Sequence, residues 1–300
     1  MFIDQLRSSI KAPLSRRSLR TILLAPVFFA ATAQVDPAPR GEADWSAEKQ
    51  GEALDLGKSK QVFAEEFSKP VSLDGPVLFA KQHADYGRAG FDPPGGAAYA
   101  FRDGALALRV YSDGQRMRGA NVQSVSSAQS YTGAPIVPGR QGFTCAGCYW
   151  EARLRFPEAR GTWGGFWLLT PDDPRNRGHL EVDVVEYYGI GDERGLHHSL
   201  HRWRPKELGG HTRQSDYVRM PEIADFGWHT YGVDLRGSSS NDAKQQAVFY
   251  VDGKEVRRVP VDDEFLKKPF YFLNTLTISA KKQEITLPQE LLVDYVRVWH

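Results

Sequence analysis

The chain has few of the features that would indicate a redox, metal or nucleic-acid-binding protein. It contains only two cysteines, Cys145 and Cys148, and three methionines in 300 residues. A C-x-x-C pair is typical of thioredoxin-like enzymes beside a βαβ pattern, which this sequence lacks. One pair also supplies at most half of a four-ligand zinc site. The two cysteines are therefore expected to form a small local disulfide or to remain inert thiols.

A strong charge of either sign and a long apolar run are also missing. The net charge of +1 gives no general attraction to nucleic acid or to an anionic membrane. The apolar run Thr21–Ala33 is too short to span a bilayer, which needs ~20 apolar residues. Arg16, Arg17 and Arg20 precede it, and small residues close it. This order predicts a cleaved, twin-arginine-like export signal over residues 1–33 and a secreted or periplasmic protein. The alternative is an uncleaved anchor.

Long amphipathic helices and internal repeats are absent from the pattern as well. From residue 61 onward, short segments of alternating apolar and polar residues are separated by Gly, Pro, Asp and Asn. The clearest are Ala105–Tyr111, Tyr149–Phe156, Leu180–Val185, Ala247–Val251 and Leu292–Trp299. This period of two predicts strands, and many short strands predict one all-β sandwich over residues 61–300. Asp-Gly pairs at 103–104 and 252–253 predict tight hairpins.

Residues 34–60 differ in composition from the predicted sandwich. They are rich in Pro, Glu, Asp, Gly and Lys and poor in large apolar side chains. Such a segment cannot bury enough apolar surface to fold alone. We therefore expect a flexible leader or linker between the export signal and the domain.

Three carboxylates interrupt the apolar segment His179–Gly189. Glu181 and Asp183 are two residues apart and share a strand face, whereas Glu186 would fall on the opposite face of a regular strand. One extra residue, a β-bulge at Val184–Val185, would return Glu186 to their face. Bulges are over-represented beside active sites because they redirect a side chain. The spacing therefore predicts a bulged strand that presents all three carboxylates together.

Two glutamates with an aspartate between them suit the chemistry of a retaining glycosidase, which needs carboxyl groups ~5–5.5 Å apart. We expect the two glutamate backbones to be roughly 6.5–7 Å apart, so that flexible side chains meet this spacing. In this hypothesis Glu181 is ionised, Glu186 holds a proton, and Asp183 adjusts both. The alternative is a solvated edge strand with one acidic face.

The same segment resembles the signature of glycoside hydrolase family 16, in the bulged form of laminarinases, agarases and carrageenases. Other blocks resemble the family in the same order: Val62–Phe67, Tyr149–Pro157, Gly161–Leu169, Trp228–Asp234, Phe249–Gly253 and Val293–Trp299. The resemblance implies a concanavalin-like jelly roll with a glycan groove across its concave sheet. It also implies an endo-β-glycanase in which Glu181 is the nucleophile, Asp183 assists, and Glu186 is the acid/base.

The resemblance points to five further substrate-binding positions. Trp163 and Trp167 would line the sugar subsites, since sugars stack on aromatic rings; the alternative for Trp167 is a place in the core. His201 resembles a histidine of the groove, and Trp203 follows it on the same predicted strand. Arg153 resembles an arginine of the concave face, with a structural ion pair as the alternative.

Neither the residues nor the resemblance predicts a cofactor for the reaction. His197 and His198 are interpreted as solvated loop histidines rather than zinc ligands. Some family members hold a structural calcium with an aspartate that matches Asp294, although one carboxylate alone is thin support. The expected partner is a polysaccharide bound by a monomer, with no nucleic acid and no membrane beyond the export signal.

Two departures from the family pattern bear on the substrate. His201–Lys206, followed by His211 and Arg213, and the loop Asp172–Arg177 place arginines where they would suit acidic groups. The alternative is a solvated loop of mixed charge. Leu273–Ser279 lacks the glycines that relatives carry there. The substrate is thus expected to be β-1,3-glucan-like or an acidic exopolysaccharide or galactan. A transglycosylase and a non-catalytic, lectin-like module remain alternatives.

Overall fold

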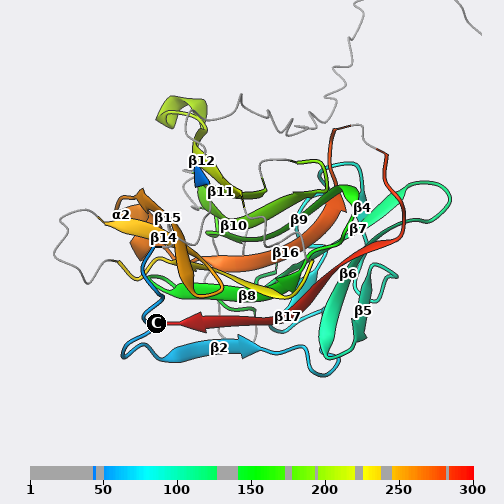
Figure 1. The fold of residues 1–300 in the computed structure, drawn as a ribbon, viewed down its shortest axis with the longest axis horizontal. Coiled ribbons are helices and arrows are strands. Elements are labelled where there is room, and N and C mark those ends of the chain that lie inside the picture. The colour runs from blue at the N-terminus through cyan, green and yellow to red at the C-terminus, as the bar shows by residue number, and fades with distance from the viewer. Residues whose placement is uncertain are drawn as a thin grey trace, which may run out of the picture. The chain divides into compact units, whose positions relative to one another are not determined.

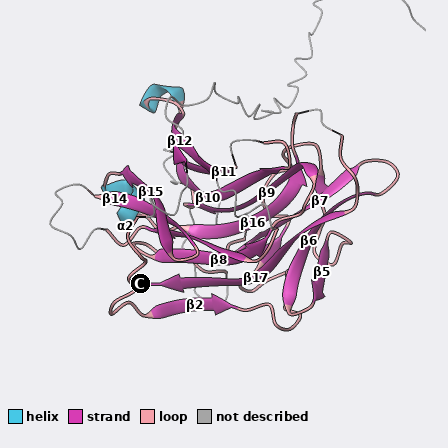
Figure 2. Cartoon of the chain, viewed as in Figure 1, coloured by secondary structure: helices cyan, strands magenta, loops and turns pink. Residues whose placement is uncertain are grey.

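The computed structural model describes eight stretches of the chain: residues 43–44, 51–126, 141–172, 178–192, 195–219, 226–237, 245–281 and 284–300. The predicted export signal and most of the 34–60 leader lie outside these residues. The regular elements of the described part are almost all strands, as the sequence predicts (Figure 2). It contains no helix long and apolar enough to cross a membrane.

One of two antiparallel sheets, sheet A, carries the segment with the three carboxylates. Its strands in spatial order are β1 (Ala43–Asp44), β12 (Thr212–Arg219), β11 (Leu196–Trp203), β10 (His179–Gly189), β9 (Arg160–Leu169), β16 (Tyr271–Ile278), β7 (Met117–Gln123) and β3 (Phe79–Ala80). All of these pairings are antiparallel except that of β1 with β12. β10 therefore lies inside the sheet, between β9 and β11 (Figure 1).

The other sheet, sheet B, packs against sheet A. Its strands in spatial order are β15 (Lys254–Pro260), β14 (Gln246–Val251), β13 (His229–Asp234), β8 (Tyr149–Arg155) and β17 (Gln289–Trp299). Beyond β17 lie β6 (Ala105–Ser112) with β5 (Tyr99–Arg102), and β2 (Gln61–Glu65). β7 of sheet A also pairs with β6 of sheet B, and this pairing connects the two sheets. The short strand β4 (Gly90–Phe91) pairs with β7 as well. Two short helical segments, η2 (Lys206–Leu208) and α2 (Asp263–Lys267), complete the described elements.

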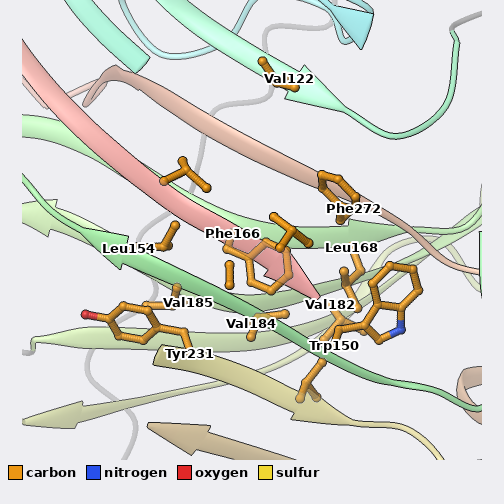
Figure 3. Close-up of a cluster of buried hydrophobic side chains, with 14 of the residues drawn as sticks. Val122, Trp150, Leu154, Phe166, Leu168, Val182, Val184, Val185, Tyr231 and Phe272 are labelled. Carbon is orange, nitrogen blue, oxygen red and sulfur yellow. The ribbon is translucent and has the colours of Figure 1, made fainter. Parts of the chain in front are cut away.

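The core lies between the two sheets. Alternate residues of each strand face it, as the period of two predicts, and the largest cluster of buried side chains draws on both sheets (Figure 3). From sheet A come Val122, Phe166, Leu168, Val182 and Phe272, and from sheet B come Trp150, Leu154 and Tyr231. This packing leaves the opposite face of sheet A available for polar side chains.

Both predicted hairpins are present. Asp103-Gly104 joins β5 to β6, and Asp252-Gly253 joins β14 to β15. All four residues have positive φ, between 49° and 74°. Two consecutive left-handed residues make the type I′ turn whose twist matches that of paired strands, which explains the Asp-Gly sequence at both turns.

The packed domain begins before the predicted boundary at residue 61. The amide of Gly51 donates to the carbonyl of Glu255 at 3.1 Å, and that of Leu54 donates to Gly253 at 2.8 Å. Leu54 and Leu56 pack on a cluster of buried residues on sheet B: Tyr149, Val248 and Tyr250. Residues 51–60 therefore belong to the domain rather than to a leader, because their two leucines cover apolar surface that would otherwise face water.

Cys145 and Cys148 form a disulfide just before β8. The backbones of Cys145 and Phe270 exchange two hydrogen bonds of 2.9 Å, and Cys148 is fully buried in the main core. The bond thus closes a short loop where the chain enters sheet B. The sequence leaves two states open for these cysteines, a local disulfide or two inert thiols, and the structure contains the disulfide.

Candidate active site

β10 contains the predicted bulge. Against β9, Asp183 pairs with Trp167 and Val185 with Phe166, so Val184 has no partner of its own. Val182, Val184 and Val185 are buried in the core, whereas Glu181, Asp183 and Glu186 face the other side of the sheet. The two consecutive core-facing valines replace the usual single residue, and this returns Glu186 to the face of Asp183.

The register places the carboxylates in three successive rungs across β9, β10, β11 and β12. The first rung consists of Leu169, Glu181, His201 and Arg213; the second of Trp167, Asp183, Ser199 and Ser215; the third of Gly165, Glu186, His197 and Tyr217. Directly opposed residues of paired strands project to the same face. The site is therefore bordered by tryptophan and glycine on the β9 side and by histidine and serine on the β11 side.

The expected backbone separation of the two glutamates is wrong. Their partners on β9, Leu169 and Gly165, are four residues apart. At 3.3–3.4 Å per residue this places the two backbones about 13 Å apart along the strand. Between the two glutamates β9 makes two steps of two residues, whereas a separation of 6.5–7 Å corresponds to one such step. A carboxyl pair that acts on one glycosidic bond would therefore need both glutamate side chains to extend over Asp183.

Each of the two glutamates, Glu181 and Glu186, accepts hydrogen bonds from donors of its own. Nε1 of Trp203 donates to Oε2 of Glu181 at 2.9 Å. Nε1 of Trp163 donates to Oε1 of Glu186 at 2.8 Å, and the Tyr188 hydroxyl donates to the same oxygen at 3.2 Å. These contacts fix the rotamers of both glutamates and favour their ionised forms.

His201 lies between Glu181 and Asp183. Its Nε2 is 3.1 Å from Oδ2 of Asp183 and 3.9 Å from Oε1 of Glu181. Its Nδ1 is 2.9 Å from Nε2 of His211, so one imidazole donates to the other. Burial lowers the pKa of His201 from its usual value, which favours the neutral ring at neutral pH.

Burial also sets the protonation of the carboxylates. Desolvation is the largest cause that raises the pKa of Glu181, of Asp183 and of Glu186, each to about 7. The negative charge of Asp183 raises the pKa of both glutamates further. Three crowded carboxylates cannot all be ionised at little cost, so the site retains at least one proton near neutral pH. This is the condition that an acid/base pair requires.

The structure brings four of the five predicted substrate-binding residues to this face. Trp163 contacts Glu186, Trp203 contacts Glu181, and His201 lies beside Asp183. Trp167 shares the rung of Asp183, but it is 7% exposed and its Nε1 donates to Thr275 at 3.0 Å. It therefore forms the floor of the site rather than an open stacking platform.

Arg153 does not join them, and its expected place on the face of the carboxylates is wrong. It lies on β8 in sheet B, opposite Thr230 and Tyr295. Its Nη1 forms an ion pair of 2.7 Å with Asp294, and its guanidinium lies 5.0 Å from the ring centre of Trp228. Arg153 therefore has the role given as the alternative from sequence, that of a partner in a structural ion pair.

Asp294 does not fit a calcium site in the described residues. Calcium takes six to eight oxygen ligands, whereas the Asp294 carboxylate is engaged by Arg153. Among the residues described, the one group of three or more converging metal-ligating side chains is Glu181, Asp183 and His201, whose ligand atoms lie within 4.8 Å of one another. These three could hold a divalent cation, but a cation there would occupy the carboxylate of Glu181, the residue that the sequence predicts as nucleophile.

Tyr86 is a site residue that the sequence does not reveal. It lies in the segment 81–88 that follows β3, and its ring is 4.9 Å from the ring of Trp163. Its hydroxyl hydrogen-bonds Thr275, and the charges of all three carboxylates act on it. Burial raises its pKa well above 10, so the phenol keeps its proton. Only the packing of this segment on β16 brings Tyr86 to the site.

The segment 81–88 is fixed to β16 by short backbone contacts. Thr277 Oγ1 donates to the carbonyl of Tyr86 at 3.0 Å, and the amide of Arg88 donates to Ile278 at 2.9 Å. Gly87 between them has φ +69°, and a Cβ there would lie 2.4 Å from the Ile278 carbonyl. Glycine is thus required for this close approach.

His211 extends the site beyond Glu181. Its ring stacks on Trp203 with centroids 3.7 Å apart, and Arg213 follows it on β12, opposite His201. Arg202 and Arg204, by contrast, form ion pairs with Glu264 on α2. In the part of the chain described, the hypothesis of an acidic substrate therefore depends on Arg213; most of the Asp172–Arg177 loop lies outside the described residues.

Comparisons with known proteins agree on one family. A profile described as glycosyl hydrolases family 16 matches residues 110–282, more than half of the chain. Among curated relatives, the endo-1,3-1,4-beta-glycanase ExsH of Rhizobium meliloti is 26% identical over 155 residues, covering 50% of this chain and 30% of the relative. The beta-glucanase of Rhodothermus marinus is 24% identical over 185 residues, covering 57% and 63%. The matches thus span 30% of the first of these relatives and 63% of the second.

Solved structures show the same fold. SCLam, a non-specific endo-beta-1,3(4)-glucanase, superposes with a TM-score of 0.62 at 17% identity and covers 84% of this chain and 95% of its own. The laminarinase catalytic domain from Thermotoga maritima gives 0.58 at 15% identity, covering 81% and 98%. At these identities the likeness concerns the jelly-roll fold, which confirms the fold class predicted from sequence.

Proposed function

Since the chain belongs to glycoside hydrolase family 16, we propose that it is an endo-acting β-glycanase that cleaves internal bonds of a polysaccharide with retention of configuration. One observation carries the proposal. A bulged strand presents three carboxylates on one face, one buried and two half-buried, and each glutamate accepts an indole N–H. A lectin would not need to hold three costly, like charges together in a buried site.

Glu181 is the nucleophile in this proposal. Its ionised form is favoured by the hydrogen bond from the Trp203 N–H. An Oε of Glu181 forms a bond to the anomeric carbon while the bond from that carbon to the glycosidic oxygen breaks. Glu186 gives its proton to the departing oxygen. The products of this step are a covalent glycosyl–Glu181 ester and a shortened chain with a free hydroxyl.

The second step reverses these roles. Glu186, now ionised, takes a proton from a water molecule whose oxygen attacks the anomeric carbon. The ester bond to Glu181 breaks, and both glutamates return to their starting states. Asp183 lies between them and raises the pKa of each. Its charge therefore helps Glu186 to hold a proton at neutral pH.

The substrate that we propose first is a β-1,3- or mixed β-1,3-1,4-glucan. The two relatives from Rhizobium meliloti are endo-1,3-1,4-beta-glycanases, and that from Rhodothermus marinus is a beta-glucanase. Trp163 and Trp203 lie at the two ends of the carboxylate row, where aromatic rings can bind successive sugars. An acidic polysaccharide is the second candidate, and Arg213 in the rung of Glu181 favours it.

We also propose that the enzyme acts outside the cytoplasm. The order of residues 1–33 supports export, and the Cys145–Cys148 disulfide suits an oxidising compartment. Expression with and without residues 1–33, followed by fractionation, tests this. Enzyme in the periplasm or medium only when the segment is present supports it, and equal cytoplasmic retention of both forms contradicts it.

The activity is tested with the full chain on a panel of laminarin, mixed-linkage glucan, agarose, carrageenan and an acidic bacterial exopolysaccharide. We expect reducing ends from internal cleavage of one or two of these substrates. Glu181→Gln should abolish them, and Arg213→Gln should weaken cleavage of an acidic substrate only. Binding without cleavage, equal in the parent and in Glu181→Gln, would overturn the enzyme and leave a glycan-binding module.

A further inference from the structure

The bulge of β10 interrupts the residue-for-residue pairing with β11 at two buried valines. Against β11, Asp183 pairs with Ser199 and Glu186 with His197, so the single residue His198 stands opposite both Val184 and Val185. Both valines are buried, at 1% and 0% exposure. A buried carbonyl without a partner is costly, and a bulge leaves such a group by its nature.

The side chain of His198 hydrogen-bonds the backbone at this bulge. Its Nδ1 lies 2.6 Å from the carbonyl oxygen of Val184. The ring is fully buried, and it packs 5.1 Å from the ring of Phe249 on sheet B. The interpretation of His198 as a solvated loop residue is therefore wrong. The residue belongs to β11 and faces the core between Leu196 and Leu200.

The protonation of His198 fits this contact. A carbonyl accepts, so Nδ1 must carry the hydrogen. Burial, aided by the positive charge of Arg257, lowers the pKa of the ring to about 3, which keeps it neutral with a single N–H. Nε2 is then the unprotonated nitrogen, and it has no hydrogen-bond partner among the described residues. The single N–H of the His198 ring therefore donates to the Val184 carbonyl in the bulge.

The backbone of His198 is itself held from sheet B. Arg257 on β15 donates from Nη1 to the carbonyl of His198. Its Nε lies 3.9 Å from Oδ2 of Asp216 on β12. The contacts therefore run from β15 to β11 and from β11 to the bulge in β10. They reach the site from the core side, where no substrate can enter.

We propose that His198 is a positioning residue for the reaction: by donating to the Val184 carbonyl it fixes the bulge that sets Glu186 beside Asp183. The proposal rests on the proposed function, because it assigns to Glu186 the acid/base role. His198 touches none of the reacting atoms. It acts through the backbone of β10, and its loss allows Glu186 to move away from the bond to be cleaved.

Two substitutions separate the hydrogen bond from the packing. His198→Phe keeps an aromatic ring beside Phe249 and removes the N–H, whereas His198→Gln keeps a donor. Leu196→Ala, on the same face of β11, is the control for general damage to the core. We expect His198→Phe to lower kcat about 10- to 100-fold, as small displacements of catalytic groups do. KM should change by less than about threefold, and His198→Gln should recover part of the loss.

The pH profile distinguishes positioning from structural damage. Glu186 released from the neighbourhood of Asp183 loses one cause of its raised pKa. The basic limb of the profile should therefore move to lower pH in His198→Phe and remain in place in Leu196→Ala. A wild-type kcat and an unmoved profile in folded His198→Phe would contradict the proposal.

A second measurement needs neither substrate nor a variant. Imidazole ¹⁵N NMR of the wild-type protein should show His198 neutral, with its proton on Nδ1, from pH 5 to pH 8. A ring protonated on Nε2, or one that titrates in this range, would overturn the proposal even if His198→Phe does not fold. If the panel shows no cleavage while the Nδ1 proton is observed, the proposed function fails and the bulge contact stands.

Discussion

At the scale of single residues, the two glutamates of the site differ in their partners rather than in their burial. Both have a pKa raised to about 7, chiefly by desolvation. Glu181 accepts a hydrogen bond from Trp203 and lies near His201, whereas Glu186 accepts from Trp163 and Tyr188. Asp183 is common to both. Removing the Asp183 carboxylate is therefore the single change that most directly alters the pKa of both glutamates.

Asp183→Asn should move the whole pH–activity profile to lower pH. The negative charge of Asp183 raises the pKa of Glu181 and that of Glu186. Without it both pKa values fall, so Glu181 remains ionised to lower pH and Glu186 loses its proton earlier as the pH rises. We also expect a loss of about 10- to 100-fold in kcat, at or below the lower end of the ~10²–10⁴-fold contribution of a general acid or base, because Asp183 acts through the two glutamates. Rates of reducing-end release from pH 4 to pH 9 test this; an unmoved profile contradicts the role of Asp183.

The two tryptophans of β9 offer a matched pair of substitutions. Trp163→Phe removes the N–H that donates to the Glu186 carboxylate, whereas Trp167→Phe removes the N–H that donates to the Thr275 hydroxyl. Loss of the first bond should raise the pKa of Glu186 and extend activity to higher pH, with kcat/KM lowered about tenfold, as expected for one hydrogen bond to a charged group. Trp167→Phe should leave the basic limb in place. Equal shifts in both variants would exclude a specific role for Trp163.

At the scale of elements, the strands and the bulge of β10 could be predicted because side-chain alternation is a local property of the chain. Two consecutive core-facing valines between Asp183 and Glu186 break that alternation visibly. The same rule could have placed His198 in the core, since it lies between Leu196 and Leu200 at a spacing of two.

Other features could not be predicted because they depend on tertiary packing. Arg153 alternates correctly on β8, but the pattern does not say to which sheet β8 belongs. Tyr86 lies in a segment without periodicity and reaches the site only through contacts with Thr277 and Ile278. Leu54 and Leu56 are isolated apolar residues in a polar stretch, and their burial follows from their backbone pairing with the hairpin that contains Gly253.

The segment 51–60 leads to a prediction about truncation. A chain that begins at residue 61 loses Leu54 and Leu56 from the surface of Tyr149 and Tyr250. Because both leucines are partly buried, we expect its free energy of unfolding to be about 2 kcal/mol below that of a chain beginning at residue 51. Urea denaturation of the two forms measures the difference. Equal midpoints would show that the segment does not contribute to the stability of the domain.

At the scale of the whole molecule, the site reduces the stability of the fold in which it lies. Folding raises the pKa values of Glu181, Asp183 and Glu186 to about 7, above the ordinary values of 4.5, 3.8 and 4.5 for these side chains. The folded state therefore binds protons more tightly than the unfolded chain between about pH 4 and pH 7. Stability must fall as the pH rises through that window.

The variant Glu181→Gln, Asp183→Asn, Glu186→Gln should accordingly be more stable than the parent at pH 8, by at least about 3 kcal/mol, which is the cost of ionising one of these glutamates. The gain should shrink as the pH falls toward 4.5, where the folded parent already has its carboxylates protonated. Chemical denaturation at pH 4.5, 6 and 8 measures this. A gain that is constant across the three pH values would show that it does not come from buried charge.

The central claim is that Glu181 and Glu186 have distinct roles, and azide rescue tests it most directly. Glu181→Ala and Glu186→Ala are each incubated with azide and an activated aryl glycoside of the sugar found in the panel, and the glycosyl azide is examined by NMR. We predict an α-glycosyl azide from Glu181→Ala, because azide replaces the nucleophile, and a β-glycosyl azide from Glu186→Ala, because azide replaces the water. The opposite pair of anomers, or rescue of neither variant while the parent remains active, would contradict the account.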